Sequence, residues 1–370
     1  MRKLSLIPFL IYAALAISCT TNSDKAVTIL DLKDLIVDTL YLEKDTLTKD
    51  LGINFTYYKT DSGEVLATFL NHQLIVYSYP EGKLLRKQKY EQEGPDGIGF
   101  FVTGNYIDEN SIYFLSQQKE LIQCDFEGRV IHRSDFPEIS TARKYANYST
   151  MGFNKIQKSG NELFFVDIPY VFLEGFEDYD KWGVTFNIES QSFSNFDFLY
   201  PKNITEFTND DQLGLFSHIY LPTSDEHLIG FAISDTIVLV KNGKQTWKWA
   251  GTTEPLVYKK GITVPSGEYT VYQPDHESSK YNGLDFDTQA EKILRWVRIK
   301  GPTLENREQE KNRLLVFDKN LSSEAELDFK FKEMGMSGFN TPRGYALTLY
   351  TETTDDVTAF AVIDFSKIKD

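Results

Sequence analysis

One short segment recurs six times along this chain, and the recurrence limits what the chain can fold into. Each copy is a short apolar segment followed by a turn, which is the pattern of a β-strand. The six copies are Gln73 to Tyr79, Glu120 to Phe126, Gly183 to Glu189, Thr236 to Asn242, Leu314 to Asn320 and Ala359 to Phe365. A unit repeated this often indicates a repeat architecture rather than two unrelated domains.

The spacing of the copies suits the blades of a β-propeller. Their starts are 47, 63, 53, 78 and 45 residues apart, close to blades of roughly 40 to 50 residues with loop insertions. A second strand precedes each copy, and a first strand can be placed near Gly99, Met151, Leu215, Gly283 and Gly338. Gly-containing turns such as Glu81-Gly82-Lys83 lead into a fourth strand. Since aromatic residues, at 14%, also favour sheets, we predict an all-β, six-bladed propeller of four-stranded antiparallel blades.

The two ends of the chain are expected to close the ring. Only residues 366–370 follow the sixth copy, too few for a fourth strand. Leu35 to Glu43 alternates in polarity but belongs to no unit. We predict that this N-terminal strand completes the last blade, which leaves only short, protected edges. A two-domain α/β fold would need several amphipathic helices, whereas only Pro302 to Arg313 favours one.

The N-terminus has the features of a lipoprotein signal peptide. Arg2 and Lys3 precede an apolar run from Leu4 to Leu15 that is too short to span a bilayer. The following Leu-Ala-Ile-Ser-Cys19 resembles the lipobox of bacterial lipoproteins, in which the cysteine is lipidated. We therefore expect a signal peptide over residues 1–18, lipidated Cys19 with a polar tether over 19–26, and the propeller over 27–370. The alternative is an ordinary signal peptide with a chance cysteine.

The composition narrows the location and the partners further. Thr20 stands where Asp would retain a lipoprotein at the inner membrane, so we expect an outer-membrane lipoprotein facing either the periplasm or the outside. The formal charge of −15 argues against nucleic acid as a partner, because phosphate contacts need clustered Lys and Arg. Without its signal peptide the chain keeps 37 basic and 54 acidic residues, so it remains strongly acidic. Because Cys19 is expected to carry lipid, Cys124 has no second cysteine with which to form a structural disulfide.

One loop carries a family resemblance. The segment Tyr90 to Gly99 contains Glu-Gly-Pro-Asp-Gly-Ile-Gly. Together with the Cys19 lipobox and the strands around Ile75 to Tyr79 and Ile112 to Leu115, it resembles an uncharacterised family of Bacteroides-type lipoproteins with a TolB-like six-bladed propeller. The resemblance covers the whole chain and implies a fold and a location. It implies no reaction.

Catalytic and metal motifs are missing from the sequence. His276-Glu277-Ser278-Ser279-Lys280 begins like a zinc-protease helix but has Lys where the second His must stand. Asp285-Phe286-Asp287 lacks the Gly and the Glu that complete a calcium loop. We therefore predict no catalytic residue, no metal and no cofactor.

The candidate binding face is the channel end where the inner strands begin, since propellers commonly bind ligands there. The predicted strands bring six polar residues toward it, namely Asp96, Asn147, His218, Tyr281, Asn340 and Arg343. One Arg with amides and aromatic rings suits a sugar, a peptide or an anion. Two alternatives are that Arg343 pairs internally with an acid such as Asp96, and that the Gly and Pro residues of the 94–99 loop only shape turns.

These observations favour a non-enzymatic module that binds an envelope protein, a glycan or a peptide. A hydrolase or lyase acting on glycans or peptides in the channel is the alternative, because propellers host such chemistry without a portable motif. A structural role in an envelope complex is a third class. The sequence leaves the oligomeric state open. For the insert at residues 251–280 we predict an extended surface excursion with a short hairpin that caps one face of the ring.

Overall fold

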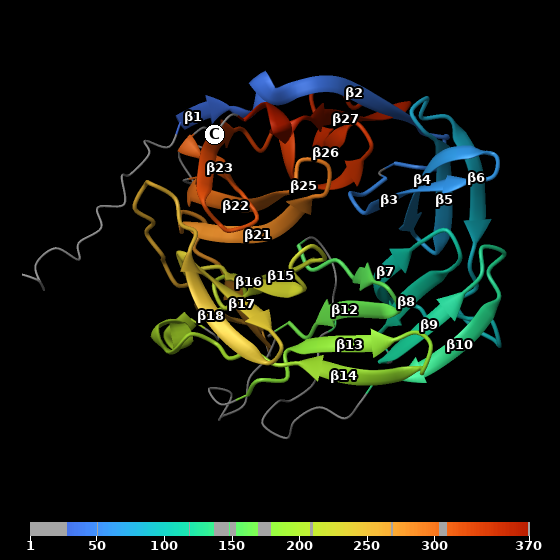
Figure 1. Cartoon of the computed structure of the whole chain (residues 1–370), viewed down its shortest axis with the longest axis horizontal. Helices are drawn as coiled ribbons and strands as arrows, with labels where there is room; N and C mark the ends of the chain where they lie inside the picture. Colours follow the sequence, from blue (N-terminus) through green and yellow to red (C-terminus); the bar gives the residue numbers. More distant parts are fainter. Residues whose placement is uncertain are drawn as a thin grey trace, which may run out of the picture.

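The chain forms a ring of six β-sheets around a central axis (Figure 1). The computed structural model describes residues 28–368 apart from 50, 118, 137–147, 149–152, 169–178, 208–209, 268 and 303–308. The signal sequence, Cys19 and the tether lie outside the described residues. The predicted all-β, six-bladed propeller is confirmed. In the described part of the chain, no helix has the length and apolar character needed to cross a membrane.

Each blade has four antiparallel strands in chain order from the axis outward, except that the outer strand of the last blade comes from the N-terminus. Blade 1 consists of β3 Phe55–Thr60, β4 Gly63–Leu70, β5 Gln73–Ser78 and β6 Leu84–Lys89. Blade 2 consists of β7 Val102–Ile107, β8 Ile112–Ser116, β9 Glu120–Cys124 and β10 Val130–Asp135. Blade 3 consists of β11 Gln157–Ser159, β12 Glu162–Val166, β13 Gly183–Asn187 and β14 Ser192–Phe196. Blade 4 consists of β15 Phe216–Leu221, β16 Glu226–Phe231, β17 Thr236–Lys241 and β18 Lys244–Trp249. Blade 5 consists of β21 Lys280–Asp287, β22 Lys292–Lys300, β23 Lys311–Phe317 and β24 Ser323–Phe329. Blade 6 consists of β25 Met334–Thr341, β26 Gly344–Leu349, β27 Val357–Ile363 and β2 Ile36–Glu43. All six predicted repeat segments form the third strand of a blade.

The core consists of six apolar clusters, one between each pair of neighbouring blades. Alternate residues of one strand serve two clusters, because successive side chains point to opposite faces of a sheet. On β22, Leu294 and Trp296 pack toward blade 6, whereas Ile293 and Val297 pack toward blade 4. Each blade therefore depends on both neighbours for the burial of its faces.

The predicted closure of the ring is confirmed. Strand β2 pairs antiparallel with β27, with Leu42 opposite Thr358. The backbone N–H of Glu43 also donates to the carbonyl of Gly82, at 2.9 Å, in the β5–β6 turn of blade 1. Gly82 has φ +68°, and a Cβ there would lie 1.7 Å from the carbonyl oxygen of Tyr41. Glycine is thus required where the closing strand meets the first blade.

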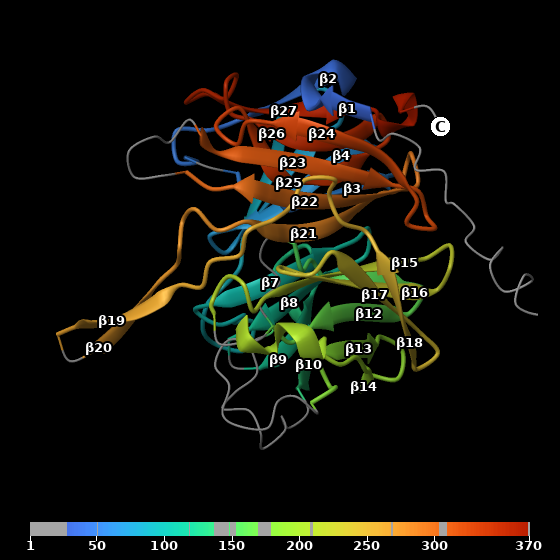
Figure 2. The same cartoon turned by 90° about the vertical axis from the view of Figure 1, so that its left-hand side faces the viewer.

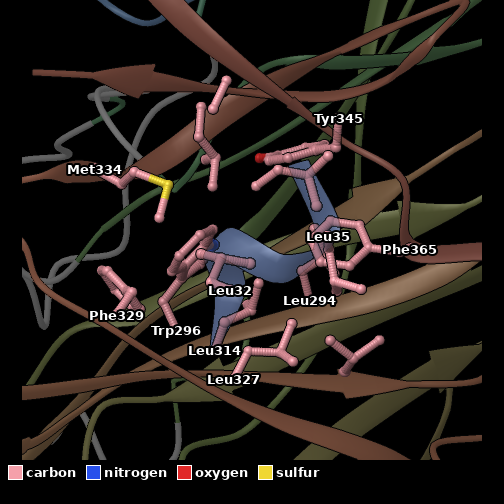
Figure 3. Close-up of a cluster of buried hydrophobic side chains, with 14 of the residues drawn as sticks. Leu32, Leu35, Leu294, Trp296, Leu314, Leu327, Phe329, Met334, Tyr345 and Phe365 are labelled. Atoms are coloured by element: carbon pink, nitrogen blue, oxygen red, sulfur yellow. The ribbon is translucent and has the colours of Figure 1, made fainter. Parts of the chain in front are cut away.

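A second N-terminal contact was not predicted. Strand β1, Thr28–Asp31, pairs in parallel with β24 and gives blade 5 a fifth strand. The 3₁₀ helix η1, Leu32–Leu35, then inserts Leu32 and Leu35 into the cluster between blades 5 and 6 (Figure 3). Residues 28–43, which we call the N-terminal strap, therefore join two blades.

The insert between blades 4 and 5 forms the predicted hairpin, with β19 Ile262–Ser266 and β20 Tyr269–Gln273. The predicted cap was wrong, because the hairpin extends away from the body of the ring (Figure 2). Its base is held by Gly261, whose N–H donates to Asp210 Oδ2 at 2.8 Å. The helix predicted for Pro302 to Arg313 was wrong at its C-terminal end, because residues from Lys311 onward belong to β23. Residues 303–308 of the predicted helix lie outside the described part of the chain.

Candidate functional site

A cavity of about 440 Å³ lies on the ring axis and is the candidate site. Every inner strand contributes to its wall. The aromatic side chains of the wall are Phe55, Tyr57, Tyr106, Phe153, Tyr220, Phe286 and Phe339, and its amides are Asn54, Asn105, Gln157, Gln289 and Asn340. A largely apolar wall with a few polar groups is the usual composition of a small-molecule site, and the volume falls in the usual range.

A segment of blade 3 crosses the channel beside this cavity. The Lys155 ammonium lies 2.7 Å from Asp285 Oδ2 of blade 5 and also donates to the carbonyl of Gly338 in blade 6. Phe153 packs so closely on Gly283 of blade 5 that a Cβ at Gly283 would lie 2.0 Å from the Phe153 ring. Residues 153–155 therefore link blade 3 to the two blades on the far side of the ring.

Amide side chains join neighbouring inner strands. Asn154 donates to the carbonyl of Phe216, at 3.0 Å, and accepts from the N–H of His218, at 2.9 Å. Gln157 accepts from the N–H of Tyr220 at 2.7 Å. Asn340 acts similarly between blades 6 and 5, donating to the carbonyl of Phe286 at 2.9 Å. These bonds satisfy backbone N–H and C=O groups that face a neighbouring blade instead of pairing with an adjacent strand. They therefore connect adjacent blades along the wall.

His218 lines the cavity as part of a neutral histidine pair. Its Nε2 lies 3.0 Å from Nδ1 of His227, whose ring stacks on Phe196 with the centroids 3.8 Å apart. Burial holds the pKa of His218 well below its ordinary value and lowers the pKa of His227 to about 4. Both rings are therefore uncharged near pH 7, because removal from water disfavours the imidazolium.

The other charged groups of the wall are internally paired. Asp285 accepts from Lys155 and from the hydroxyl of Tyr345. Lys158 forms an ion pair with the buried carboxylate of Asp108. The lysine charges are thus compensated by protein carboxylates, and the wall is suited to a ligand with little net charge.

The structure separates the six residues predicted to gather at the channel. His218 and Asn340 line the cavity; Asp96, Tyr281 and Arg343 do not; and Asn147 lies outside the described residues. The wall also contains residues that were not predicted from the sequence, including Tyr106, Lys155 and Asn105. The inner strands of blades 2 and 3 start later than predicted, at Val102 rather than near Gly99 and at Gln157 rather than near Met151, and Lys155 lies just before the second of these strands.

Asp96 belongs to the periphery of the ring, which corrects its predicted position. Its Oδ1 accepts from the N–H of Val130 on β10, the outer strand of blade 2. Arg133 of the same strand donates to the carbonyls of Pro95, at 3.2 Å, and of Gly97. The Glu-Gly-Pro-Asp-Gly-Ile-Gly loop therefore fastens the connection between blades 1 and 2 to an outer edge.

Tyr281 is a buried residue between blades 4 and 5, again away from the cavity. Its hydroxyl donates to Asp235 at 2.6 Å, and the guanidinium of Arg295 lies 3.5 Å from its ring centroid. Arg295 is fully buried and donates to the carbonyls of Ala250 and Ser234. Burial raises the pKa of Tyr281, so the phenol stays protonated and has a structural role.

Arg343 pairs within the protein, but with Asp38 on the closing strand β2 rather than with Asp96. The arginine side chain is 49% exposed, and exposed ion pairs stabilise proteins by only about 0.2 to 1 kcal/mol.

We expect Arg343→Ala to lower the free energy of unfolding by an amount within that range, measured by urea denaturation. Asp38→Ala should have a similar effect, and the double variant should be no worse than either single one. Additive losses would contradict the pairing.

Comparison with known proteins identifies the family. The family model described as domain of unknown function (DUF4221) matches residues 30–326, more than half of the chain. No curated protein matches the sequence. A crystal structure of a DUF4221 family member from Bacteroides vulgatus has a TM-score of 0.71 at 13% identity, covering 89% of this chain and 97% of that one.

Two further solved structures are similar at lower scores. A protein of unknown function from Bacteroides caccae has a TM-score of 0.41 at 11% identity, covering 76% of this chain and 84% of that one. The extracellular domain of a putative one-component system from B. thetaiotaomicron has a TM-score of 0.39 at 11% identity, covering 88% and 40%. The match to the family model, supported by the fold shared with the B. vulgatus member, shows that the chain belongs to the DUF4221 family.

Proposed function

We propose that this chain is a lipid-anchored protein of the bacterial outer membrane that binds a small polar ligand in its central cavity without transforming it. The proposed ligand is a sugar or a short peptide of low net charge. The observation that carries the proposal is the wall of the 440 Å³ cavity, which combines aromatic rings and amides from all six blades. Aromatic faces and amides suit sugar rings and peptide groups, which are amphipathic and rich in hydrogen-bonding groups.

The charge of the wall favours a neutral ligand over an anion. The sequence had suggested a sugar, a peptide or an anion as the ligand. Lys155 and Lys158 each contact a carboxylate, and Arg343 is turned to Asp38. An anionic ligand would have to break one of these pairs and leave a buried carboxylate uncompensated, which is costly. A neutral ligand has no such cost.

Unpartnered polar atoms of lining residues support hydrogen bonding by a ligand. The side-chain oxygen of Asn54 and Nδ1 of His218 are buried and have no hydrogen-bond partner among the described residues. Both residues line the cavity. Because a buried polar group is normally satisfied, a ligand hydroxyl or amide N–H is a suitable complement to the Asn54 oxygen.

The enzymatic alternative has less support from the wall. Canonical glycoside hydrolysis uses two carboxyl groups about 5 to 10 Å apart. Among the described lining residues Asp285 is the one carboxylate, and it is bound by Lys155 and Tyr345. If the chain nevertheless hydrolyses a bound glycan, Asp285→Asn should abolish turnover. We favour binding.

Filling the cavity is the test of the binding site. Asn105 lines the wall on β7, and Asn105→Trp places an indole in the channel. We expect calorimetric titration with uncharged disaccharides and capped dipeptides to detect a ligand. The indole should weaken its binding by at least about tenfold, equivalent to about 1.4 kcal/mol. The matched control is Ser194→Trp, at an exposed position of the outer strand β14. Binding that survives Asn105→Trp would place the ligand outside the cavity.

Replacement of Cys19 tests the anchor separately. A diacylated cysteine with an N-acyl chain buries hydrocarbon at about 0.8 kcal/mol per CH₂, so two or more chains give stable anchoring. We expect Cys19→Ser to move the protein from the membrane to the soluble fraction, or to leave it unprocessed at the inner membrane. The melting temperature should not change. Mass spectrometry of the native protein that finds Cys19 unmodified, or a different first residue, would contradict lipidation.

A further inference from the structure

The outer strand of blade 4 presents an aromatic and basic surface. Trp247 is 44% exposed and Trp249 is 55% exposed, and they share a face of β18 because they are two residues apart. Gln245, on that same face, accepts from the N–H of Leu199 at 3.1 Å, which places exposed Leu199 beside them. The other face of the strand carries the exposed side chains Lys244 and Lys248. We call the exposed side chains on both sides of this outer strand the β18 face.

The composition of this strand differs from that of the protein around it. Its sequence, Lys-Gln-Thr-Trp-Lys-Trp, has two basic residues and no acid, whereas the whole chain has 54 acidic residues against 39 basic ones. Tryptophan is enriched at membrane–water interfaces, and lysine is attracted to anionic headgroups. The β18 face therefore has the chemistry of a membrane-contacting surface.

The chain enters the propeller close to this face. Thr28, the first residue of β1, pairs with Ala325 of β24. The turn just before β24 includes Asn320, and the carbonyl of Asn320 accepts from Lys248 of β18 at 3.2 Å. In Figure 1, β1 and β18 accordingly lie on the same side of the ring. The entry point and the β18 face are thus joined through a single turn of blade 5.

The length of the tether restricts where a membrane can lie. Residues 20–27 separate Cys19 from Thr28, and a fully extended chain of this length spans roughly 30 Å. A lipid on Cys19 therefore keeps Thr28, at the outer edge of blade 5, within that distance of the bilayer.

We propose that the β18 face rests on the membrane surface, with Trp247 and Trp249 at the headgroup level and Lys244 and Lys248 facing anionic headgroups. The inference rests on the proposed lipidation of Cys19 for its geometry. The ring then stands on its rim with its axis along the membrane plane. In this orientation neither end of the central channel faces the bilayer, so a ligand can reach the channel from the aqueous phase.

The tryptophan content makes the proposal directly measurable. The chain has four tryptophans, and the other two, Trp182 and Trp296, are fully buried. Lipid-sensitive emission therefore reports on the β18 face. We would incorporate the lipidated full-length mature protein into vesicles of phosphatidylethanolamine and phosphatidylglycerol that contain lipids brominated near the headgroup. The expected result is a shift of emission to shorter wavelength and a loss of intensity compared with unbrominated vesicles.

Variants assign the signal to the surface. Trp247→Ser with Trp249→Ser should remove the quenchable part of the emission and leave the protein in the vesicle fraction. The matched control is Phe100→Ser with Phe101→Ser, two exposed residues of the loop that joins β6 of blade 1 to β7 of blade 2. This variant should be quenched like the unchanged protein.

The outcomes separate the two proposals. A protein that does not sediment with the vesicles would overturn the lipid anchor itself. A protein that sediments but whose emission is unaffected by brominated lipid would leave the anchor standing and overturn the β18 face as its contact. A shift of the emission of Cys19→Ser to shorter wavelength that occurs without vesicles, and only at concentrations where analytical ultracentrifugation detects a dimer, would also overturn it and assign β18 to a second copy of the chain.

Discussion

Deletion of residues 28–43 is expected to abolish the cooperative fold of this protein. The deletion removes the strap, which leaves the edge of β27 unpaired and strips β1 from β24. It also removes four buried leucines, Leu32, Leu35, Leu40 and Leu42, from the clusters on both sides of blade 6. Truncation of a single buried leucine costs about 2 to 5 kcal/mol, and whole domains are stable by only about 5 to 15 kcal/mol.

Thermal unfolding followed by circular dichroism measures this effect. The matched control is deletion of residues 20–27, which should leave the melting temperature unchanged because these residues precede the first strand of the structure. The strap deletion should show no cooperative transition. A milder version, Leu32→Ala with Leu35→Ala, tests the packing of η1 while the pairing of β2 is kept. Equal melting temperatures for the two deletions would contradict closure of the ring by the strap.

The second large effect is expected at Arg313, which lies at the centre of a buried ionic network in blade 5. Arg313 and Glu326 are each 1% exposed and form an ion pair. Arg313 also binds Asp328 and lies 3.0 Å from Glu254. Glu326 accepts in addition from the N–H of Thr253 at 2.6 Å, which ties the start of the insert after blade 4 to blade 5.

We expect Arg313→Ala to lower the free energy of unfolding by about 3 to 5 kcal/mol, because it leaves a buried carboxylate without its partner. Urea denaturation at neutral pH measures this loss. Arg313→Met with Glu326→Leu should recover most of it, since apolar residues can replace a buried pair at little cost. Lys59→Ala, which breaks an exposed pair with Glu64, is the control and should cost no more than about 1 kcal/mol. A loss of that small size for Arg313→Ala would show that the network is not structurally important.

The sequence was sufficient to predict the repeat. The third strands, such as β17 and β23, are buried on both faces between two clusters, so their apolar character shows in the residues themselves. The outer strand β2 was predicted for a different reason, since it alternates in polarity and had no other blade to join. Both inferences used only local patterns and the count of strands.

The features that escaped prediction all depend on contacts between residues far apart in the sequence. The four residues of β1 are too few to show a period, and their partner β24 lies near the other end of the chain. Lys155 has no local mark of its role, because both of its partners belong to blades 5 and 6. An internal ion pair was one of the alternatives predicted for Arg343, yet its partner is Asp38 of the strap rather than Asp96.

The closure of the ring also dictates an order of events when the protein folds. Strand β2 leaves the ribosome long before its partner β27, because the two strands lie near opposite ends of the chain. Pairing between segments so distant in the sequence is slow, because a long loop must close first. Until then β2 and the growing edge of each new blade are unpaired strands, which are prone to aggregation. Folding of this protein therefore includes a period of vulnerability to aggregation that ends only when β27 pairs with β2.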